Sequence, residues 1–339
     1  MITFRAIPTY KKFIIFIFPF FLFLLLQLHA YNYSIVFVHI GKTLPNYLPT
    51  ALEQARLFNK NADIILIANQ EAIKKTPYNF SRYTISIVTC ESLQKTQEHL
   101  YFLRHSTLNR SFREGFWLHA TERFYYLHEF MEQYQKKHVF HLESDNMLYA
   151  NLQKILPVFT THYTEKIGAT FDNDARCIPG FMYISGVGVL YDLISFMLQK
   201  TESAYNDMRI ISLFKNEFPE HIKQLPITCK QYAKDRQLKS KKNHCTKNPK
   251  HYYQHYDEFE GIFDAAALGQ YLGGQDPRNG PCQPGFINES CLFDPSHFSF
   301  IWQKDRHERN VPYLVYKNKK YKIINLHIHS KKLALYSSL

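Results

Sequence analysis

Two carboxylates stand in a pattern that could hold a divalent cation. Glu143 and Asp145 follow the apolar run 139–142, which is typical of a buried central strand. Residues two apart on a strand point the same way, so both carboxylates would project from its carboxyl end, where open α/β sheets bind ligands. Paired oxygen ligands suit Mg²⁺ or Mn²⁺, which can hold a diphosphate between them. The same residues also fit an acidic turn, because Asp145-Asn146 is favourable turn chemistry.

Two histidines lie on a second alternating segment near the end of the chain. In residues 322–331 (KIINLHIHSK), His327 and His329 share one face of an expected strand, and isoleucine and leucine side chains fill the other. Two imidazoles on one strand face can serve as metal ligands or as phosphate donors. The alternative is an ordinary polar strand face.

The elements around these residues follow an alternating pattern. We expect strands at 34–40, 63–68, 84–88 and 167–171, and helices at about 50–60, 93–103, 117–136, 192–199 and 206–218. Strand, helix and strand at this spacing form a βαβ unit with parallel strands. An Ala-rich helix should follow Asp264 and end at a Gly pair, and a hairpin of 313–316 and 321–329 should close the chain.

The composition fits a folded chain with anionic partners. The 339 residues allow one large domain or two modest ones. Apolar residues make up 45% and charged residues 21%, which argues against general disorder. Lys and Arg (41) exceed Asp and Glu (29), which favours nucleotide phosphates, nucleic acid or a membrane surface as partners. Part of the excess lies in 234–250, and we predict a basic surface insertion over 230–257.

The front of the chain carries a targeting signal. Residues 13–28 are almost purely apolar and follow Arg5, Lys11 and Lys12, so the positive flank should stay cytoplasmic. The run is short for a span of about twenty residues and long for a signal-peptide core, which leaves a signal anchor, our preference, or a cleaved signal. With an anchor over 1–30 the chain is a type II membrane protein, in the Golgi or endoplasmic reticulum if eukaryotic; with a cleaved signal it is secreted.

Cysteines and sequons fit this topology. Three disulfides and N-glycosylation of a lumenal or extracellular domain are compatible with the sequence. The cysteines are Cys90, Cys177, Cys229, Cys245, Cys282 and Cys291, and the sequons begin at Asn32, Asn79, Asn109 and Asn288.

These motifs resemble those of nucleotide-sugar-dependent glycosyltransferases of the glycosyltransferase-A fold. Glu143-Ser144-Asp145 is similar to their D-x-D motif, and Asn325-Leu326-His327 is similar to the late histidine motif that completes the metal site in several families. Ala120–Leu127 resembles the helix before D-x-D, in which an arginine, here Arg123, reaches the nucleotide sugar. Ile40-Gly41-Lys42 resembles the loop that lies next to the base and ribose, and the segment 263–274 resembles an acceptor-side segment.

The resemblance implies an α/β, Rossmann-like fold with a mixed central sheet and helices on both faces. It also implies one domain over 31–339, with a nucleotide-sugar-binding half at 31–160 and an acceptor and metal-completing half at 161–339. The implied activity is transfer of a hexosyl group from a nucleotide-diphosphate sugar to a glycan, protein or lipid acceptor, with Mn²⁺ or Mg²⁺ as cofactor. The metal ligands would be Glu143, Asp145, His327 and His329.

An inverting reaction would also require a carboxylate that deprotonates the acceptor hydroxyl. Asp264 is the first candidate, followed by Asp207 and Glu260. Asp264 also fits the N-cap of the Ala-rich helix.

Two other classes of protein remain open from the sequence. The positive charge permits a nucleic-acid-binding protein, but the chain carries no RNP motif, zinc finger or spaced arginine helix, and we do not expect nucleic acid as a partner. A catalytically silent, secreted carbohydrate-binding or interaction protein with the same fold is the other alternative, because a fold does not imply activity.

Overall fold

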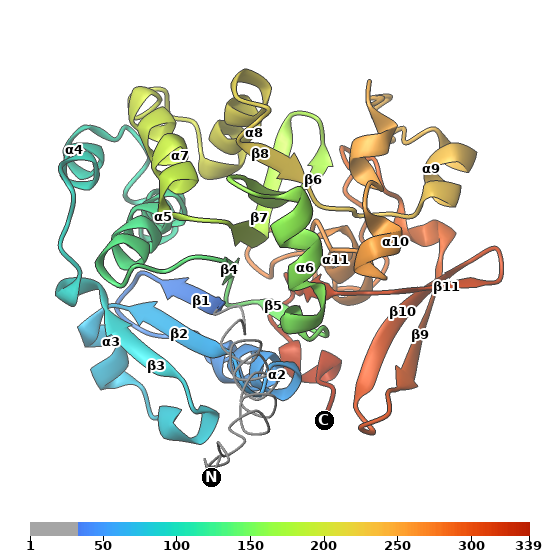
Figure 1. Cartoon of the computed structure of the whole chain (residues 1–339), viewed down its shortest axis with the longest axis horizontal. Helices are drawn as coiled ribbons and strands as arrows, with labels where there is room; N and C mark the ends of the chain where they lie inside the picture. The colour runs from blue at the N-terminus through green and yellow to red at the C-terminus, as the bar shows by residue number, and fades with distance from the viewer. Residues whose placement is uncertain (1–32) are drawn as a thin grey trace, which may run out of the picture. The chain divides into compact units, whose positions relative to one another are not determined.

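A seven-stranded mixed sheet runs through the part of the chain that the computed structural model describes, residues 33–339 (Figure 1). Its strands are β1 (Ser34–His39), β2 (Asp63–Ala68), β3 (Ser86–Thr89), β4 (Val139–Leu142), β6 (Ile167–Asn173), β7 (Arg176–Ile184) and β8 (Ile222–Gln224). The strand order is β3-β2-β1-β4-β7-β6-β8. The first four strands in this order run parallel, β7 is antiparallel to β4 and β6, and β8 is parallel to β6. The predicted mixed sheet is confirmed.

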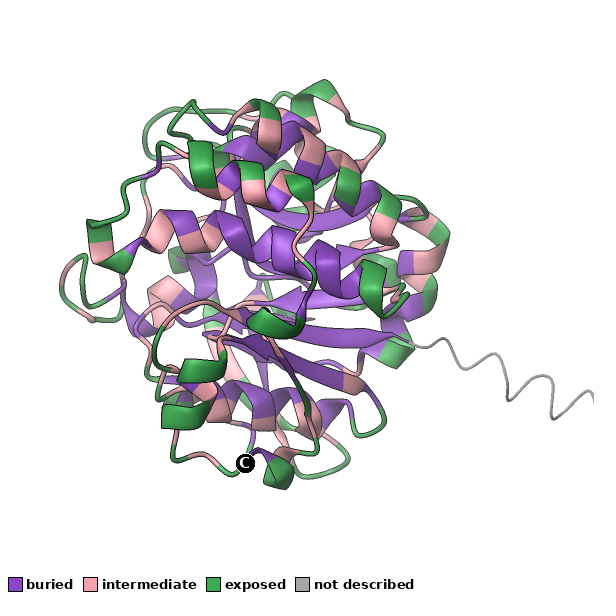
Figure 2. Ribbon diagram, turned by 90° about the vertical axis from the view of Figure 1, so that its left-hand side faces the viewer, coloured by how far each residue is buried: buried purple, intermediate pink, exposed green. Residues whose placement is uncertain are grey.

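Helices surround this sheet and turn their exposed faces outward (Figure 2). They are α2 (Leu48–Phe58), α3 (Gln70–Lys75), α4 (Gln97–His105), α5 (Phe116–Gln133), α6 (Leu152–His162), α7 (Val187–Gln199), α8 (Asp207–Glu217), α9 (Lys230–Arg236), α10 (Tyr256–Phe259) and α11 (Ala267–Gly273). Local signals set several starts: Thr96 caps α4 and Asn206 caps α8 by accepting backbone N–H bonds. Among residues 33–339 no helix is long and apolar enough to cross a membrane. The predicted anchor at 13–28 lies outside the described residues.

Two smaller sheets complete the structure. One joins β9 (Ser299–Lys304), β10 (Asn310–Tyr316) and β11 (Lys319–Lys322), and the other pairs β5 (Asn146–Leu148) with β12 (Asn325–His327). The closing hairpin was predicted to continue to residue 329, but β11 ends at Lys322 and β12 joins a different sheet. The physical reason is burial: Ile324 is 1% exposed, and its backbone bonds to Ile262 and Tyr149 instead of to β10.

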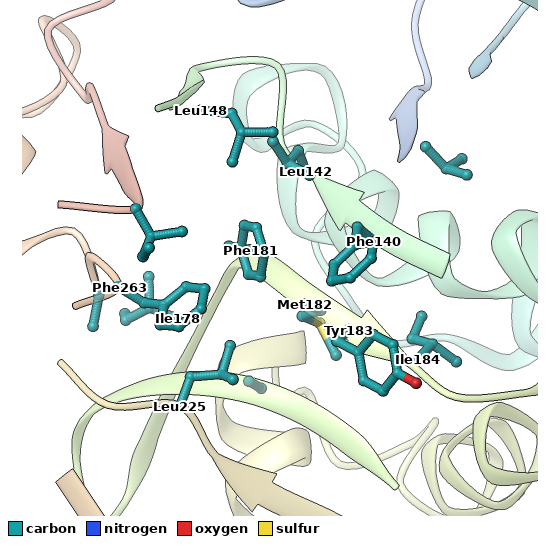
Figure 3. Close-up of a cluster of buried hydrophobic side chains, with 14 of the residues drawn as sticks. Phe140, Leu142, Leu148, Ile178, Phe181, Met182, Tyr183, Ile184, Leu225 and Phe263 are labelled. Carbon is teal, nitrogen blue, oxygen red and sulfur yellow. The ribbon is translucent and has the colours of Figure 1, made fainter. Parts of the chain in front are cut away.

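Aromatic side chains fix β4 in the middle of the core. Phe140 lies 6.0 Å from Phe181 and 5.2 Å from Tyr183, measured between ring centroids, and Phe181 lies 5.0 Å from Phe263 (Figure 3). All four residues are fully buried. Burial of each such side chain contributes roughly 1.5–3 kcal/mol. The end of β4, where the acidic motif begins, is therefore held rigidly.

Buried tyrosines hold the basic segment 230–257 in place. The Tyr252 hydroxyl donates to Asp174 at 2.6 Å, and Tyr232 is 1% exposed.

All six cysteines lie among the described residues and none forms a disulfide there. Four of them are buried.

Candidate active site

The pairing of β12 with β5 brings the acidic motif and the late histidines together. Glu143 directly follows β4, and Asp145 directly precedes β5. On β12, His327 is paired with Asn146, and the next backbone N–H, that of Ile328, donates to the carbonyl of Asp145 at 2.9 Å. In Figure 1 the green β5 lies beside the red C-terminal part of the chain. This strand pair places the His327 side chain next to both carboxylates.

The His327 imidazole contacts both acids through one nitrogen. Nε2 lies 2.9 Å from Oε2 of Glu143 and 3.1 Å from Oδ1 of Asp145. The His329 ring lies 4.4 Å from the His327 ring, and ligand atoms of Asp145, His327 and His329 all lie within 4.8 Å of one another. The side-chain amide of Gln270 holds His329 through Nδ1 at 2.8 Å. The structure thus brings together all four residues that the sequence offered as metal ligands.

Two glycines make room for His327. A Cβ atom on Gly180 would overlap the imidazole ring, and one on Gly269 would overlap the backbone carbonyl of His327. Gly180 belongs to β7 and Gly269 to α11, so both neighbouring elements approach the histidine closely. A larger residue at either position would displace His327 from the carboxylates.

A network of amides and one carboxylate positions β12. Asn325 donates to the side-chain carbonyl of Asn146 at 2.9 Å, and Asn146 donates to the carbonyl of Gly180 at 2.9 Å. Asp264 accepts the backbone N–H groups of Leu268, Gly269 and His327, each at 2.9 Å, and is 1% exposed. With both carboxylate oxygens occupied, Asp264 ties the first turn of α11 to β12. The N-cap residue of α11 is Ala266, so the predicted N-cap position at Asp264 is wrong, although the Asp264 carboxylate still satisfies two backbone N–H groups of the first turn.

Arg123 connects the acidic motif to a third carboxylate. Its guanidinium lies 2.5 Å from Oε1 of Glu143 and 2.9 Å from Oδ2 of Asp207, and its side chain is 9% exposed. Asp207, the first residue of α8, is buried as well. Arg123 thus holds Glu143 in place, and Asp207 balances its charge. Glu260 lies exposed just after α10, and no ion pair or hydrogen bond joins it to this cluster among the described residues.

Lys331 and Tyr47 belong to the site although the sequence did not single them out. The Lys331 ammonium pairs with Oδ2 of Asp145, lies 4.0 Å from Asp276 and sits over the Tyr47 ring at 5.6 Å. A signal for Lys331 was present, because it continues the two-residue spacing of His327 and His329. No comparable pattern marks Tyr47 or Asp276.

Tyr47 brings the loop after β1 to the cluster. Within the loop, Ile40 is half-buried, and the backbone N–H of Gly41 donates to the side chain of Asn69 at 2.9 Å. Lys42 is exposed. Ser144 is half-buried between the two acids. The loops after β1 and β4 therefore meet at the carboxyl edge of the parallel strands.

Opposite charges control ionisation in the cluster. Burial opposes the ionised form of Glu143, but Arg123 and His327 hold its pKa well below the usual range. Burial likewise opposes the ionised form of Asp145, but Lys331 and His327 lower its pKa. The two carboxylates raise the pKa of His327 to about 10 despite its burial, whereas burial and the neighbouring His327 lower the pKa of His329 to about 3.

The donor atoms fit a divalent cation. Two carboxylates and an imidazole nitrogen already face one another, and His327 is held there through Nε2, since its buried Nδ1 has no hydrogen-bond partner among residues 33–339. Oxygen-rich sites with one or two imidazoles suit Mn²⁺ better than Mg²⁺ or Ca²⁺. A cation bound here would take over the neutralisation of the acids that Lys331 and His327 now provide, and His327 would have to release its Nε2 proton to bind it.

Comparisons with known proteins find solved structures that resemble this fold at low sequence identity. No protein-family model and no curated protein sequence matches the chain. Among solved structures, mouse xyloside xylosyltransferase 1 aligns with 60% of this chain and 89% of its own at 10% identity and a TM-score of 0.42. A complex of the galactosyltransferase LgtC aligns with 57% of this chain and 73% of its own at 13% identity and a TM-score of 0.39. A cytidylyltransferase from Leptospira borgpetersenii aligns with 57% of this chain and 76% of its own at 11% identity and a TM-score of 0.37. Solved glycosyltransferases are thus among the structural neighbours, at similarities too low to assign an activity.

Proposed function

We propose that the chain is a metal-dependent glycosyltransferase that moves a sugar, in our reading a hexosyl group, from a nucleotide-diphosphate donor to a hydroxyl of a glycan, protein or lipid. The observation that carries the proposal is the convergence of Glu143, Asp145 and His327 at the carboxyl edge of β4. Ligands bind at this edge in open α/β sheets. Hard oxygen donors with an imidazole beside them suit a cation that holds a diphosphate.

The proposed chemistry rests on neutralising the leaving group. A divalent ion held by Asp145 and His327 would stabilise the charge of the nucleoside diphosphate as the sugar–phosphate bond breaks. Lys331 places a second positive charge beside Asp145. Once the Asp145 carboxylate binds the cation, the Lys331 ammonium would be free to pair with the diphosphate oxygens. Arg123 keeps Glu143 ionised and correctly oriented. The loop of Ile40, Gly41 and Lys42 would bind the base and ribose.

We assign Asp264 and Asp207 positioning roles. Both carboxylates are buried, Asp264 is occupied by three backbone N–H groups, and Asp207 is paired with Arg123. A general base must reach the hydroxyl whose proton it takes. These contacts favour support of β12 and of Arg123 over proton abstraction. Glu260 is accessible but stands outside the cluster.

One observation favours the silent carbohydrate-binding alternative. Asp145 already has a cationic partner in Lys331, so the site can be electrically balanced without a metal. Such a chain could keep the fold and bind sugars without turning over a donor. Donor hydrolysis separates the two functions.

The decisive experiment is a nucleotide-sugar panel incubated with the full-length chain and Mn²⁺. We expect metal-dependent hydrolysis of one class of donor, and its loss in Asp145→Asn. Binding of the free diphosphate with Mn²⁺ but no turnover of any donor would support the silent protein. If neither diphosphate nor donor binds, the proposed function is wrong.

We also propose that residues 13–28 anchor the chain, with residues 31–339 on the non-cytoplasmic side. The proposal rests on the apolar run and on the basic residues before it. A lumenal location would give the enzyme access to transported nucleotide sugars. The exposed Asn79 and Asn109 sequons would then be available for glycosylation.

A further inference from the structure

A second group of metal-ligating side chains lies outside the candidate active site. It consists of His162, the last residue of α6, together with His255 and Glu258 from the segment around α10. Nε2 of His162 lies 2.6 Å from Oε2 of Glu258, and Nδ1 of His255 lies 2.8 Å from Oε1 of the same carboxylate. The two residues on the α10 segment are three positions apart, which places them on one face of a helical turn.

The arrangement directs two imidazole nitrogens toward one carboxylate. The rings of His162 and His255 stack at 3.9 Å with 23° between their planes. One ligand atom from each of the three residues lies within 4.8 Å of the others. The side chains of His162, His255 and Glu258 are 25%, 18% and 50% exposed, so an ion from solvent can reach them.

We propose that His162, His255 and Glu258 form a binding site for Zn²⁺. Two imidazole nitrogens and one carboxylate oxygen are a donor set that Zn²⁺ favours, with a fourth position left for water. Ligands at about 2.0–2.2 Å from one ion stand farther apart than hydrogen-bonded atoms, so each imidazole nitrogen must move away from its carboxylate oxygen by less than about 1 Å. The half-exposed Glu258 can make this movement, and the histidine rings then tilt out of their stack so that their lone pairs meet at the ion.

Zinc at this position would add a link between two elements that are distant in the sequence and already pack together, since the ring of Phe159 in α6 lies 4.8 Å from that of Phe259 in α10. His162 ends a helix that packs on the core beside β4, whereas His255 lies at the end of the basic segment 230–257 and Glu258 directly follows that segment. A cavity of about 460 Å³ adjoins the cluster, with His255 in its wall together with Lys223, Lys230 and Lys250. Bound zinc therefore pins the wall of a positively charged cavity to α6. We expect it to stabilise the folded chain by mass action.

The test is a Co²⁺ titration of the full-length, chelator-stripped chain. Co²⁺ can replace Zn²⁺ in such a site, and it absorbs visible light when it is bound by four ligands. To remove the other centre, the titration uses the background variant His327→Ala. We expect one Co²⁺ per chain in this background, displaced by Zn²⁺, and an affinity at least about tenfold weaker after His162→Ala, His255→Ala or Glu258→Gln.

His251→Ala is the matched control, because His251 is an exposed histidine of the same segment that stands outside the three ligands. It should leave Co²⁺ binding unchanged. Equal affinity in His162→Ala, His255→Ala and the control would overturn the proposal, as would the absence of any Co²⁺ binding in the background variant. Should the background variant fail to fold, anomalous scattering from zinc-soaked crystals of the unmodified chain decides: a peak between His162 and Glu258 supports the site, and its absence overturns it. Loss of this zinc leaves diphosphate binding by the other centre intact, so the two proposals fail independently.

Discussion

Nε2 of His327 lies 3.1 Å from Oδ1 of Asp145, although the two residues come from opposite halves of the chain. The contact exists because β12 runs antiparallel to β5, the strand that starts immediately after Asp145. Glu143 completes the arrangement at 2.9 Å from the same nitrogen. The predicted juxtaposition of the acidic motif with the late histidine is thus present in the fold, and the metal-binding role that we propose for it yields testable expectations.

Asp145→Ala should abolish metal-dependent binding of a nucleoside diphosphate. The carboxylate faces both His327 and Lys331, so its removal takes away a metal ligand and leaves two cations that repel an incoming ion. We expect a loss of at least about a hundredfold in affinity, measured by calorimetry with uridine or guanosine diphosphate and Mn²⁺. Asp257→Asn, at an exposed position, is the control. Unchanged affinity in Asp145→Ala would remove this residue from the site.

The two histidines should differ in their importance. His327 faces both carboxylates, whereas His329 is held by Gln270 and contacts the cluster from the side. His327→Ala should therefore weaken Mn²⁺ binding far more than His329→Ala. Manganese electron paramagnetic resonance of each variant, titrated over the same range, gives the comparison. Equal losses would mean that both rings bind the metal equally, and a larger loss in His329→Ala would reverse the assignment.

Gly180→Ala should damage the site through sterics alone. The added Cβ overlaps the His327 ring, so β7 or β12 must shift, at a cost of about 1–3 kcal/mol in the free energy of unfolding. Metal affinity should fall in parallel. Gly188→Ala in α7 is the matched control, because its Cβ meets nothing within 4 Å. Urea unfolding of both variants tests the prediction, which fails if the two behave alike.

A cluster of histidine and glutamate side chains from α4 and α5 should make stability depend on acid pH. His99 lies 2.8 Å from Glu129 and 3.3 Å from Glu122, and His119 lies 3.0 Å from Glu122. Burial raises the pKa of Glu122, but His119 and His99 outweigh it and lower the pKa from 4.5 to about 2. The unfolded chain therefore takes up a proton first as the pH falls. This stabilisation, up to about 3 kcal/mol, is complete above pH 4.5 and is lost between about pH 4.5 and 2.

The measurement is the free energy of unfolding as a function of pH for the unmodified chain and for Glu122→Gln. The variant should show a flatter profile between about pH 4.5 and 2, because it lacks the titrating group. Glu132→Gln, exposed on the same helix, should retain the full slope. Identical slopes in Glu122→Gln and the unmodified chain would contradict the assignment.

Protease protection should reveal the topology of the chain. With residues 13–28 as an anchor and the basic flank in the cytoplasm, residues 31–339 should survive protease added outside sealed vesicles and be digested after detergent is added. Digestion of the main domain from the cytoplasmic face would reverse the topology. Recovery of the domain in the soluble fraction, lacking residues 1–30, would instead indicate a cleaved signal.

Local patterns predicted part of the secondary structure, although they missed α6 and β7, and α7 begins at Val187 instead of at the predicted residue 192. The strand at 63–68 has the predicted bounds, and α5 begins one residue before the predicted start, because apolar periodicity and capping residues act over only a few positions. The alternating segment around His327 also predicted correctly that an imidazole could lie beside the carboxylates of the acidic motif. These signals are local, and the sequence carries them directly.

Tertiary structure decided which neighbours these residues acquired. Several contacts of the site join segments that are distant in the sequence, and no spacing in the sequence specifies them. They are the contacts of Lys331 with Asp145, of Asp207 with Arg123 and of Asp264 with the backbone of His327. The closing hairpin ended early for the same reason. The apolar side chains of Ile323 and Ile324 gain more burial free energy in the core than they would as an extension of β11. The sequence by itself determined the candidate donor atoms and the strands that carry them. Only the pairing of β12 with β5 and the close approach of Gly180 decided that these atoms face one another, because burial and strand pairing depend on the whole chain.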